Sequence, residues 1–427
     1  FITPNSFLSP LTTTANVQNA VSAANANDKV WVQAGAYAAG SATATVDNLT
    51  VDVPTGVTGF TGLTLGSGVT SGTLSGAGAA DLTGNSGNNT LVGNDGNNTI
   101  TGLDGNDTLT GGGGTNTLDG GTGTDTATFA GDLAHYTISF TGTAPNVSIV
   151  VTRTVGGTSV DTIKNVEKLQ FNDKTVHVVG SSVGSELTTI QPVINAATAG
   201  DVVLVAPGTY AENLTVSKSL TLTGAGSASG NTIISPASGT AFTVSASDVT
   251  IEQLRIAGAS NTSLSNVGIY SNSVISNLAL KNLVVTNHGY GITVHNNAII
   301  SGLVITNVSA TSNQIGLRTA TSGAANNITV TNSAFNDNDY GWQINATSAR
   351  TNNQNDFSTV TVSNTTFNNN KFKGLYAEKL HNATFTNITV DGSGYGATNP
   401  NGVNVNLKYG AFANIAFTNL TVTNSGT

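Results

Sequence analysis

The stretch GNSGNNTLV GNDGNNTIT GLDGNDTLT GGGGTNTLD GGTGTDTAT, residues 84–128, decides the fold of this chain. It consists of five successive nine-residue blocks, each with glycine at its first and fourth positions and one apolar residue at its eighth. Glycine adopts tight turns that other residues avoid, and a single inward-facing side chain suits a short strand. Each block therefore predicts a six-residue turn followed by a short strand. Stacked blocks would form a flat parallel β-roll with a narrow apolar core.

The nonapeptide resembles G-G-x-G-x-D-x-U-x, the calcium-binding repeat of RTX, or haemolysin-type, proteins that bacteria secrete. The resemblance implies a roll that binds Ca²⁺ and an extracellular protein. Residues 129–177 continue the resemblance, because similar modules of β-structure often follow RTX rolls as a small cap. We interpret this segment as a packing and connecting module.

Sixth-position side chains are the candidate calcium ligands. Two blocks complete one coil, so these side chains stack between alternate blocks, and calcium takes six to eight oxygen ligands. One edge of the roll carries Asn89, Asp107 and Asp125, and the other carries Asn98 and Asn116. The Asp107–Asp125 pair predicts one good site, with weaker sites elsewhere. Asp95 and Asp104, at third positions, are expected to add charge to these sites. The alternative is a calcium-free ladder of Gly and Asn turns.

Two segments that lie 173 residues apart match each other without gaps. The segment VQNAVSAANANDKVWVQAGAYA starts at Val17, and IQPVINAATAGDVVLVAPGTYA starts at Ile190. Each copy predicts a short amphipathic helix, an Asp turn, a buried strand, and a Gly turn with an aromatic residue. Both copies resemble the start of right-handed parallel β-helices of the pectin-lyase-like superfamily. In that superfamily the helix caps the open end of the solenoid and covers its strand edges.

Glycine and asparagine recur at coil-length intervals after the second copy. The glycines are Gly268, Gly291, Gly316, Gly341, Gly374 and Gly402. The asparagines are Asn282, Asn307, Asn332, Asn364, Asn387 and Asn419. Stacked Asn side chains can form a hydrogen-bonded ladder, whereas tolerance of left-handed turns explains single positions but not the common register. The sequence therefore predicts an all-β chain, with an RTX parallel β-roll plus a right-handed parallel β-helix solenoid.

Four segments follow from these patterns. We expect a β-helix-like start with a capping helix over residues 1–74, the calcium β-roll over 75–128, the post-roll connector over 129–180, and the parallel β-helix over 181–427. No capping segment follows the last coil, whose expected core residues are Ile415, Phe417, Leu420 and Val422. We therefore expect the β-helix to continue in a longer chain, or this end to dock onto another subunit.

The composition excludes several functional classes. Charged residues make up 9% of the chain, against about 25% in an ordinary domain, and the formal net charge is −9. No basic patch could neutralise phosphates, so we expect no nucleic-acid partner. No apolar run approaches the length that spans a bilayer. Without cysteine the chain has no disulfide and no thiol nucleophile.

A column of outward residues on the β-helix is the candidate glycan- or partner-binding surface. It contains Arg318, Gln343 and Tyr376, with Glu378 in a neighbouring column, and the alternative is a solvated face that binds nothing. We expect no catalytic residues. The best candidate set spans five coils, roughly 20 Å, which is too long for one reaction centre. That set is His295, Arg318, Tyr376, Glu378 and Lys408.

We therefore expect a secreted or cell-surface bacterial protein that binds Ca²⁺ and has a structural or adhesive role. Surface layers, filaments and matrices are the assemblies that fit sparse charge and flat neutral faces. The expected partners are other copies of the chain or a cell-surface polysaccharide. Two alternatives stay open: a polysaccharide-modifying enzyme of the uronate epimerase or lyase type, and a non-catalytic glycan-binding module. Fold alone does not choose between them.

Overall fold

The computed structural model describes residues 16–143, 146–180, 183–185, 187–228, 230–294, 298–321, 325–346, 357–396, 401–407 and 412–426. Strands take up 57% of the described residues and helices 5%, which confirms the predicted all-β fold built on parallel sheets. The chain divides into two compact units, unit 1 (Phe1–Thr188) and unit 2 (Thr189–Thr427). The four-segment division is finer than this and stays a prediction. Within the described ranges, no helix is both long and apolar enough to cross a membrane.

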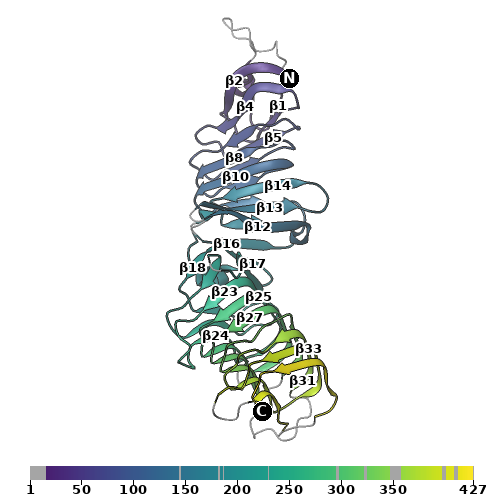
Figure 1. The fold of residues 1–427 in the computed structure, drawn as a ribbon. Helices are drawn as coiled ribbons and strands as arrows, with labels where there is room; N and C mark the ends of the chain where they lie inside the picture. Colours follow the sequence, from purple (N-terminus) through teal and green to yellow (C-terminus); the bar gives the residue numbers. More distant parts are fainter. Residues whose placement is uncertain are drawn as a thin grey trace. The chain divides into compact units, whose positions relative to one another are not determined.

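Unit 1 stacks its strands in two ladders (Figure 1). One ladder contains β2 (Gly35–Ala44), β4 (Val57–Leu65), β6 (Asp81–Thr83), β8 (Thr99–Asp104), β10 (Gly114–Thr122), β14 (Ser159–Lys164), β13 (Asn146–Arg153) and β12 (Tyr136–Thr143). The other contains β1 (Lys29–Trp31), β3 (Leu49–Asp52), β5 (Ser71–Ser75), β7 (Thr90–Val92), β9 (Thr108–Thr110), β11 (Thr126–Thr128), β15 (Lys168–Gln170) and β16 (Thr175–Val179). Pairing is parallel from β2 to β14 and from β1 to β15.

The eighth-position apolar side chains form the core of the roll. Leu91 pairs in register with Leu109, and Leu109 pairs with Ala127. In the opposite ladder Ile100 pairs with Leu118. All five have an exposed fraction of 0%. The nine-residue period thus places one apolar side chain per block inside the stack, as predicted.

The post-roll module continues the roll. Strands β12, β13 and β14 pair antiparallel with one another, but β14 then lies parallel to β10, and β15 lies parallel to β11. Phe129 stacks on Phe171 at a ring-centroid distance of 4.9 Å, and Tyr136 packs against both rings. A short 3₁₀ turn, η1 (Leu133–His135), precedes β12. Strands β14 and β15 therefore cover the last coil of the roll, one in each ladder.

The two matched segments fold alike. Helices α1 (Val17–Ala23) and α2 (Ile190–Ala196) each begin a unit. The Gln18 side chain donates to the Thr43 carbonyl and accepts the Thr43 amide N–H. Gln191 does the same with Thr215. Each glutamine amide thus satisfies backbone groups of an edge strand, which explains why this residue recurs in both copies.

Unit 2 also stacks two ladders of parallel strands (Figure 1). The first contains β17 (Val202–Val205), β18 (Gly208–Tyr210), β20 (Leu220–Thr223), β21 (Thr232–Ile234), β23 (Val249–Ala257), β25 (Val274–Thr286), β27 (Ile299–Thr311), β29 (Ala325–Thr331), β31 (Phe357–Thr366), β33 (His381–Asp391) and β35 (Ile415–Thr423). The second contains β19 (Leu214–Val216), β22 (Thr240–Val244), β24 (Val267–Ser271), β26 (Tyr290–Val294), β28 (Ile315–Thr321), β30 (Tyr340–Ala346), β32 (Lys373–Ala377) and β34 (Asn401–Val405).

The predicted asparagine ladder is present. All six residues of the column have left-handed backbone, with φ between 49° and 54°. Asn307 Nδ2 donates to Asn282 Oδ1 at 2.7 Å, and Asn387 Nδ2 donates to Asn364 Oδ1 at 2.9 Å. Asparagine tolerates this backbone conformation, and its amide at the same time joins successive coils. The left-handed turn and the hydrogen bond between coils therefore both favour asparagine at these positions.

Candidate functional site

A continuous column of buried side chains runs along one edge of the roll. The amide N–H of Asn89 donates to Asp107 Oδ1, and that of Asp107 donates to Asp125 Oδ1, both at 2.7 Å. The amide N–H of Asp125 donates in turn to Glu167 Oε2, also at 2.7 Å. All four residues are at most 3% exposed. The two predicted aspartates thus stack as expected, and Glu167 of the post-roll module adds a third carboxylate that the repeat pattern did not indicate.

Asp107 presents an oxygen that suits a cation. Its Oδ2 atom is buried and has no hydrogen-bond partner. A Cβ atom on Gly102 would collide with this oxygen and with the carbonyl oxygen of Gly120, so both oxygens face the same space beside Gly102. Burial raises the pKa of Asp107, and the amide N–H of Asn89 opposes this effect. A divalent cation at this point would compensate the buried charge, and Ca²⁺ accepts mixed carboxylate and carbonyl ligands.

Carboxylates alone would not hold the ion. Among the described residues, no three His, Asp or Glu side chains come together as a metal cluster. A calcium ion would therefore depend on backbone carbonyls of the glycine-rich turns together with Asp107 and Asp125. This ligand set fits the hard oxygen preference of Ca²⁺ and would suit zinc poorly, because zinc prefers nitrogen and sulfur ligands.

The opposite edge of the roll is mainly neutral. The amide N–H of Asn98 donates to Asn116 Oδ1 at 3.0 Å, and Asn116 Nδ2 donates to Asp161 Oδ1 at 2.8 Å. Asp161 is 2% exposed, and this burial raises its pKa to about 6. This edge therefore carries one carboxylate, supplied by the post-roll module.

The third-position aspartates lie outside both columns. Asp95 and Asp104 are exposed to solvent. Asp104 Oδ1 accepts a hydrogen bond from Thr122 Oγ1 at 2.6 Å. Strand β8 extends through Asp104, so this residue belongs to a strand and not to the turn that the repeat pattern predicted. Any influence of these two carboxylates on calcium would act through solvent.

The proposed outward column has the predicted register. Arg318, Gln343 and Tyr376 are aligned partners in β28, β30 and β32, and all three are half-buried. Glu378 differs from the expectation, because it is only 9% exposed and accepts a hydrogen bond from the Tyr376 hydroxyl. The chain leaves β32 at Ala377, so strand alternation no longer sets the direction of the next side chain. His295 and Lys408 lie outside the described residues.

The last coil exposes the side chains that the sequence assigned to its core. Leu420 and Val422 of β35 are 36% and 45% exposed, and Ile415 and Phe417 are half-buried. The Phe417 ring nevertheless stacks on Phe385 of β33 at 4.6 Å. The predicted docking of this end stays a prediction.

Unit 2 also contains a buried ladder that the sequence analysis missed. The amide N–H of Asn313 donates to Asn338 Oδ1, and that of Asn338 donates to Asn370 Oδ1. His288 heads the ladder, because its amide N–H donates to Asn313 Oδ1. The intervals of 25, 25 and 32 residues match those between coils, so the register could have been found from the sequence.

Comparison with known proteins agrees with the geometry of the roll. Residues 75–105, 83–118 and 92–127 match the RTX calcium-binding nonapeptide repeat (4 copies). The chain thus carries calcium-binding RTX repeats, which are typical of secreted bacterial proteins. A search of curated proteins found no match to the chain.

Proposed function

We propose that this chain is a secreted or cell-surface calcium-binding protein with a structural or adhesive role. In this proposal Ca²⁺ stabilises the roll, and the ladders of the β-helix provide a stiff, weakly charged surface for self-assembly or for a cell-surface polysaccharide. The observation that carries the proposal is the buried column from Asn89 to Glu167, in which Asp107 keeps an oxygen without a hydrogen bond.

The column supports calcium-dependent folding on energetic grounds. Three carboxylates, from Asp107, Asp125 and Glu167, occupy successive coils in a buried environment. Carboxylates removed from water are costly unless a cation or strong hydrogen bonds compensate them. The glycine-rich turns also lose much conformational entropy on folding. We therefore expect the roll to be ordered with Ca²⁺ and largely disordered without it.

Hydrogen exchange of the full chain tests this expectation. Residues 84–128 should gain protection when Ca²⁺ is added, and a chelator should remove it. The double variant Asp107→Asn, Asp125→Asn should lose this response. The variant Asp95→Asn, Asp104→Asn is a matched control, since it removes the same charge at exposed positions, and it should respond like the wild type. Equal loss in both variants, or full protection under the chelator, would contradict the proposal.

Electron microscopy with and without Ca²⁺ tests the structural role. Ordered arrays or fibres that need calcium would support assembly. Discrete particles that depolymerise alginate or pectin would instead support the enzyme alternative. The resemblance of unit 2 to pectin-lyase-like β-helices motivates this second assay.

A further inference from the structure

The outer face of the first ladder of unit 2 carries two aligned rows of small hydroxyl side chains. Strands β29, β31, β33 and β35 pair in parallel, and their register aligns these side chains across the strands. Alternate residues such as Val330, Val362 and Phe385 are fully buried, so the residues between them point outwards. The hydroxyl array consists of Thr329, Thr361 and Thr384 in one row and Thr331, Ser363, Thr386 and Thr418 in the other.

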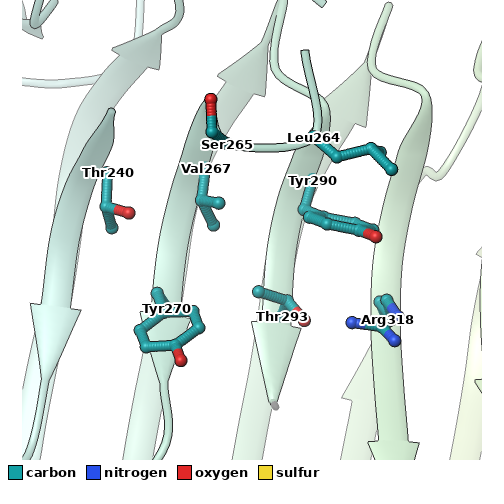
Figure 2. A pocket seen from close by; sticks show the side chains of 8 residues that line it. All are labelled: Thr240, Leu264, Ser265, Val267, Tyr270, Tyr290, Thr293 and Arg318. Atoms are coloured by element: carbon teal, nitrogen blue, oxygen red, sulfur yellow. The ribbon is translucent and has the colours of Figure 1, made fainter. Parts of the chain in front are cut away.

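The second ladder of unit 2 has a different outer face. A pocket of about 370 Å³ opens there, and Tyr270, Tyr290 and Arg318 line it (Figure 2). Large side chains around a hollow make this surface uneven. The hydroxyl array consists instead of uncharged side chains of nearly one size on adjacent strands of one ladder.

Hydrogen bonds between coils hold the array in register. Left-handed residues lie on both sides of each outward pair, as Asn327 and Asn332 do for β29 and Asn382 and Asn387 do within β33. The Nδ2 atom of Asn364 donates to Asn332 Oδ1 at 3.1 Å, and that of Asn387 donates to Asn364 Oδ1 at 2.9 Å. Threonine is β-branched, so its side chain has few conformations. The positions of the hydroxyl groups therefore follow the spacing of the backbone.

This spacing forms a two-dimensional lattice. Aligned residues on neighbouring parallel strands lie about 4.8 Å apart, and residues two apart on one strand lie about 6.6 Å apart. Oxygen atoms on the prism planes of ice repeat at distances close to these two. A threonine side chain offers a hydroxyl that forms hydrogen bonds with water and a methyl group that ordered water can surround. The array can therefore order water in a pattern that matches a face of ice.

Charge and area argue against a protein partner for the array. None of its seven residues is charged, so the array offers no ion pair. Its two rows cover on the order of 200 Å² at the usual strand spacing, whereas a stable protein interface buries about 800 Å² on each partner. An ice face needs no such area, because proteins adsorbed at scattered points already curve the growth front and slow its advance.

We propose that the hydroxyl array binds ice. Its hydroxyl groups take the places of water oxygens at the crystal surface, and its methyl groups lie in the gaps between them. The stiff parallel ladder keeps both kinds of group in position before ice is met. This activity goes beyond the structural role proposed above and needs neither Ca²⁺ nor the roll.

Slow freezing of the full chain tests the proposal. The protein is mixed with albumin, and ice is grown from a cold surface until part of the solution has frozen. A protein that binds ice enters the solid, whereas ordinary solutes are pushed into the remaining liquid. We expect this chain to be enriched in the ice relative to albumin. Equal exclusion of both proteins from the ice would overturn the proposal.

Substitutions within the array test which face binds. Thr361 and Thr384 are exposed neighbours in one row, so Thr361→Lys with Thr384→Lys should place two hydrated charges on this face and leave the core intact. Incorporation into ice should fall to the level of albumin, while the fluorescence of buried Trp342 shows that unit 2 stays folded. Thr58→Lys with Thr209→Lys is the matched control, because it makes the same changes at exposed strand positions outside the array. Equal loss in both double variants, or no loss in the first, would refute the assignment.

A chelator separates the array from the roll. Incorporation into ice should persist without Ca²⁺, because all seven residues of the array belong to unit 2. Hydrogen exchange of residues 84–128 on the same samples reports on the roll, so the proposed function is tested independently. Loss of ice binding on removal of Ca²⁺ would assign the activity to the roll, and binding to crystalline cellulose without enrichment in ice would assign the array to a polysaccharide. Either result would overturn the proposal.

Discussion

The buried imidazole of His288 should make the stability of unit 2 depend on pH. His288 is 0% exposed, and neither ring nitrogen forms a hydrogen bond. Burial lowers its pKa to about 4; the nearby Thr286 backbone and the Asn313 side chain favour the protonated form but do not offset this effect. The folded protein therefore holds this group neutral at a pH at which the unfolded chain would protonate it.

The sign and magnitude follow from this difference. Between pH 6.5 and 4 the unfolded chain binds more protons at His288 than the folded protein does, so stability falls as the pH falls through this window. The gap between about 4 and the ordinary value of 6.5 corresponds to about 3 kcal/mol. Asparagine occupies the equivalent ladder position in the next three coils, at Asn313, Asn338 and Asn370. His288→Asn should therefore remove the pH dependence and keep the ladder.

Tryptophan fluorescence can follow this effect within unit 2. The chain has two tryptophans, and Trp342 is fully buried in unit 2, whereas Trp31 of unit 1 is 50% exposed. In a Trp31→Phe background, urea unfolding at pH 7.5 and 4.5 should show the parent losing about 2–3 kcal/mol more than His288→Asn. Carboxylates that titrate in the same range affect both proteins equally. Parallel pH profiles for the two proteins would refute the reasoning.

Substitutions at three further positions test the stack itself. Gly102→Ala should raise the calcium concentration that orders the roll, because its Cβ would collide with Asp107 Oδ2. An unchanged calcium dependence of hydrogen exchange would contradict a calcium site beside Asp107 Oδ2 and the Gly120 carbonyl oxygen. Leu118→Ala, at a fully buried core position, should cost about 2–5 kcal/mol in urea unfolding of the calcium-bound protein followed by circular dichroism. Asn364→Ala should lower the free energy of unfolding by about 1–2 kcal/mol, and Asn364→Gly should lower it by less, since glycine keeps the left-handed backbone. Equal losses of stability in the two variants, followed by Trp342 fluorescence, would show that the left-handed φ at this position does not contribute.

The sequence predicted the features that repeat. A single apolar residue in each block was enough to place Leu91, Leu109 and Leu118 in the core, because a strand has only two faces. Glycine and asparagine spacing likewise predicted the register of unit 2, since one coil sets one interval. Arg318 and Tyr376 fall in one column for the same reason.

Features that break the period were not predictable in the same way. Glu167 and Asp161 join the two columns of the roll after intervals of 42 and 45 residues, because the antiparallel strands β12 and β13 intervene. Glu378 turns inward where a strand ends, and strand alternation holds only within a strand. The pocket beside Arg318 is lined in part by Leu264, which belongs to a loop without a repeat. Each of these depends on tertiary contacts.

The turns of both units contain backbone N–H groups that need a hydrogen-bond acceptor, and the two units supply it from different side chains. In both, a side-chain oxygen from one coil accepts the turn amide N–H of the coil before it: Asp107 Oδ1 accepts from Asn89, and Asn338 Oδ1 accepts from Asn313. An amide performs this task without charge, so the buried ladder of unit 2 needs no ion. A carboxylate forms a stronger hydrogen bond but leaves a buried negative charge and a second oxygen, as Asp107 Oδ2 shows. Under the proposal that the roll binds Ca²⁺, the aspartates favour the fold mainly when the cation is bound. The choice between Asn and Asp at one turn position would then make unit 1 respond to calcium and leave unit 2 stable without it.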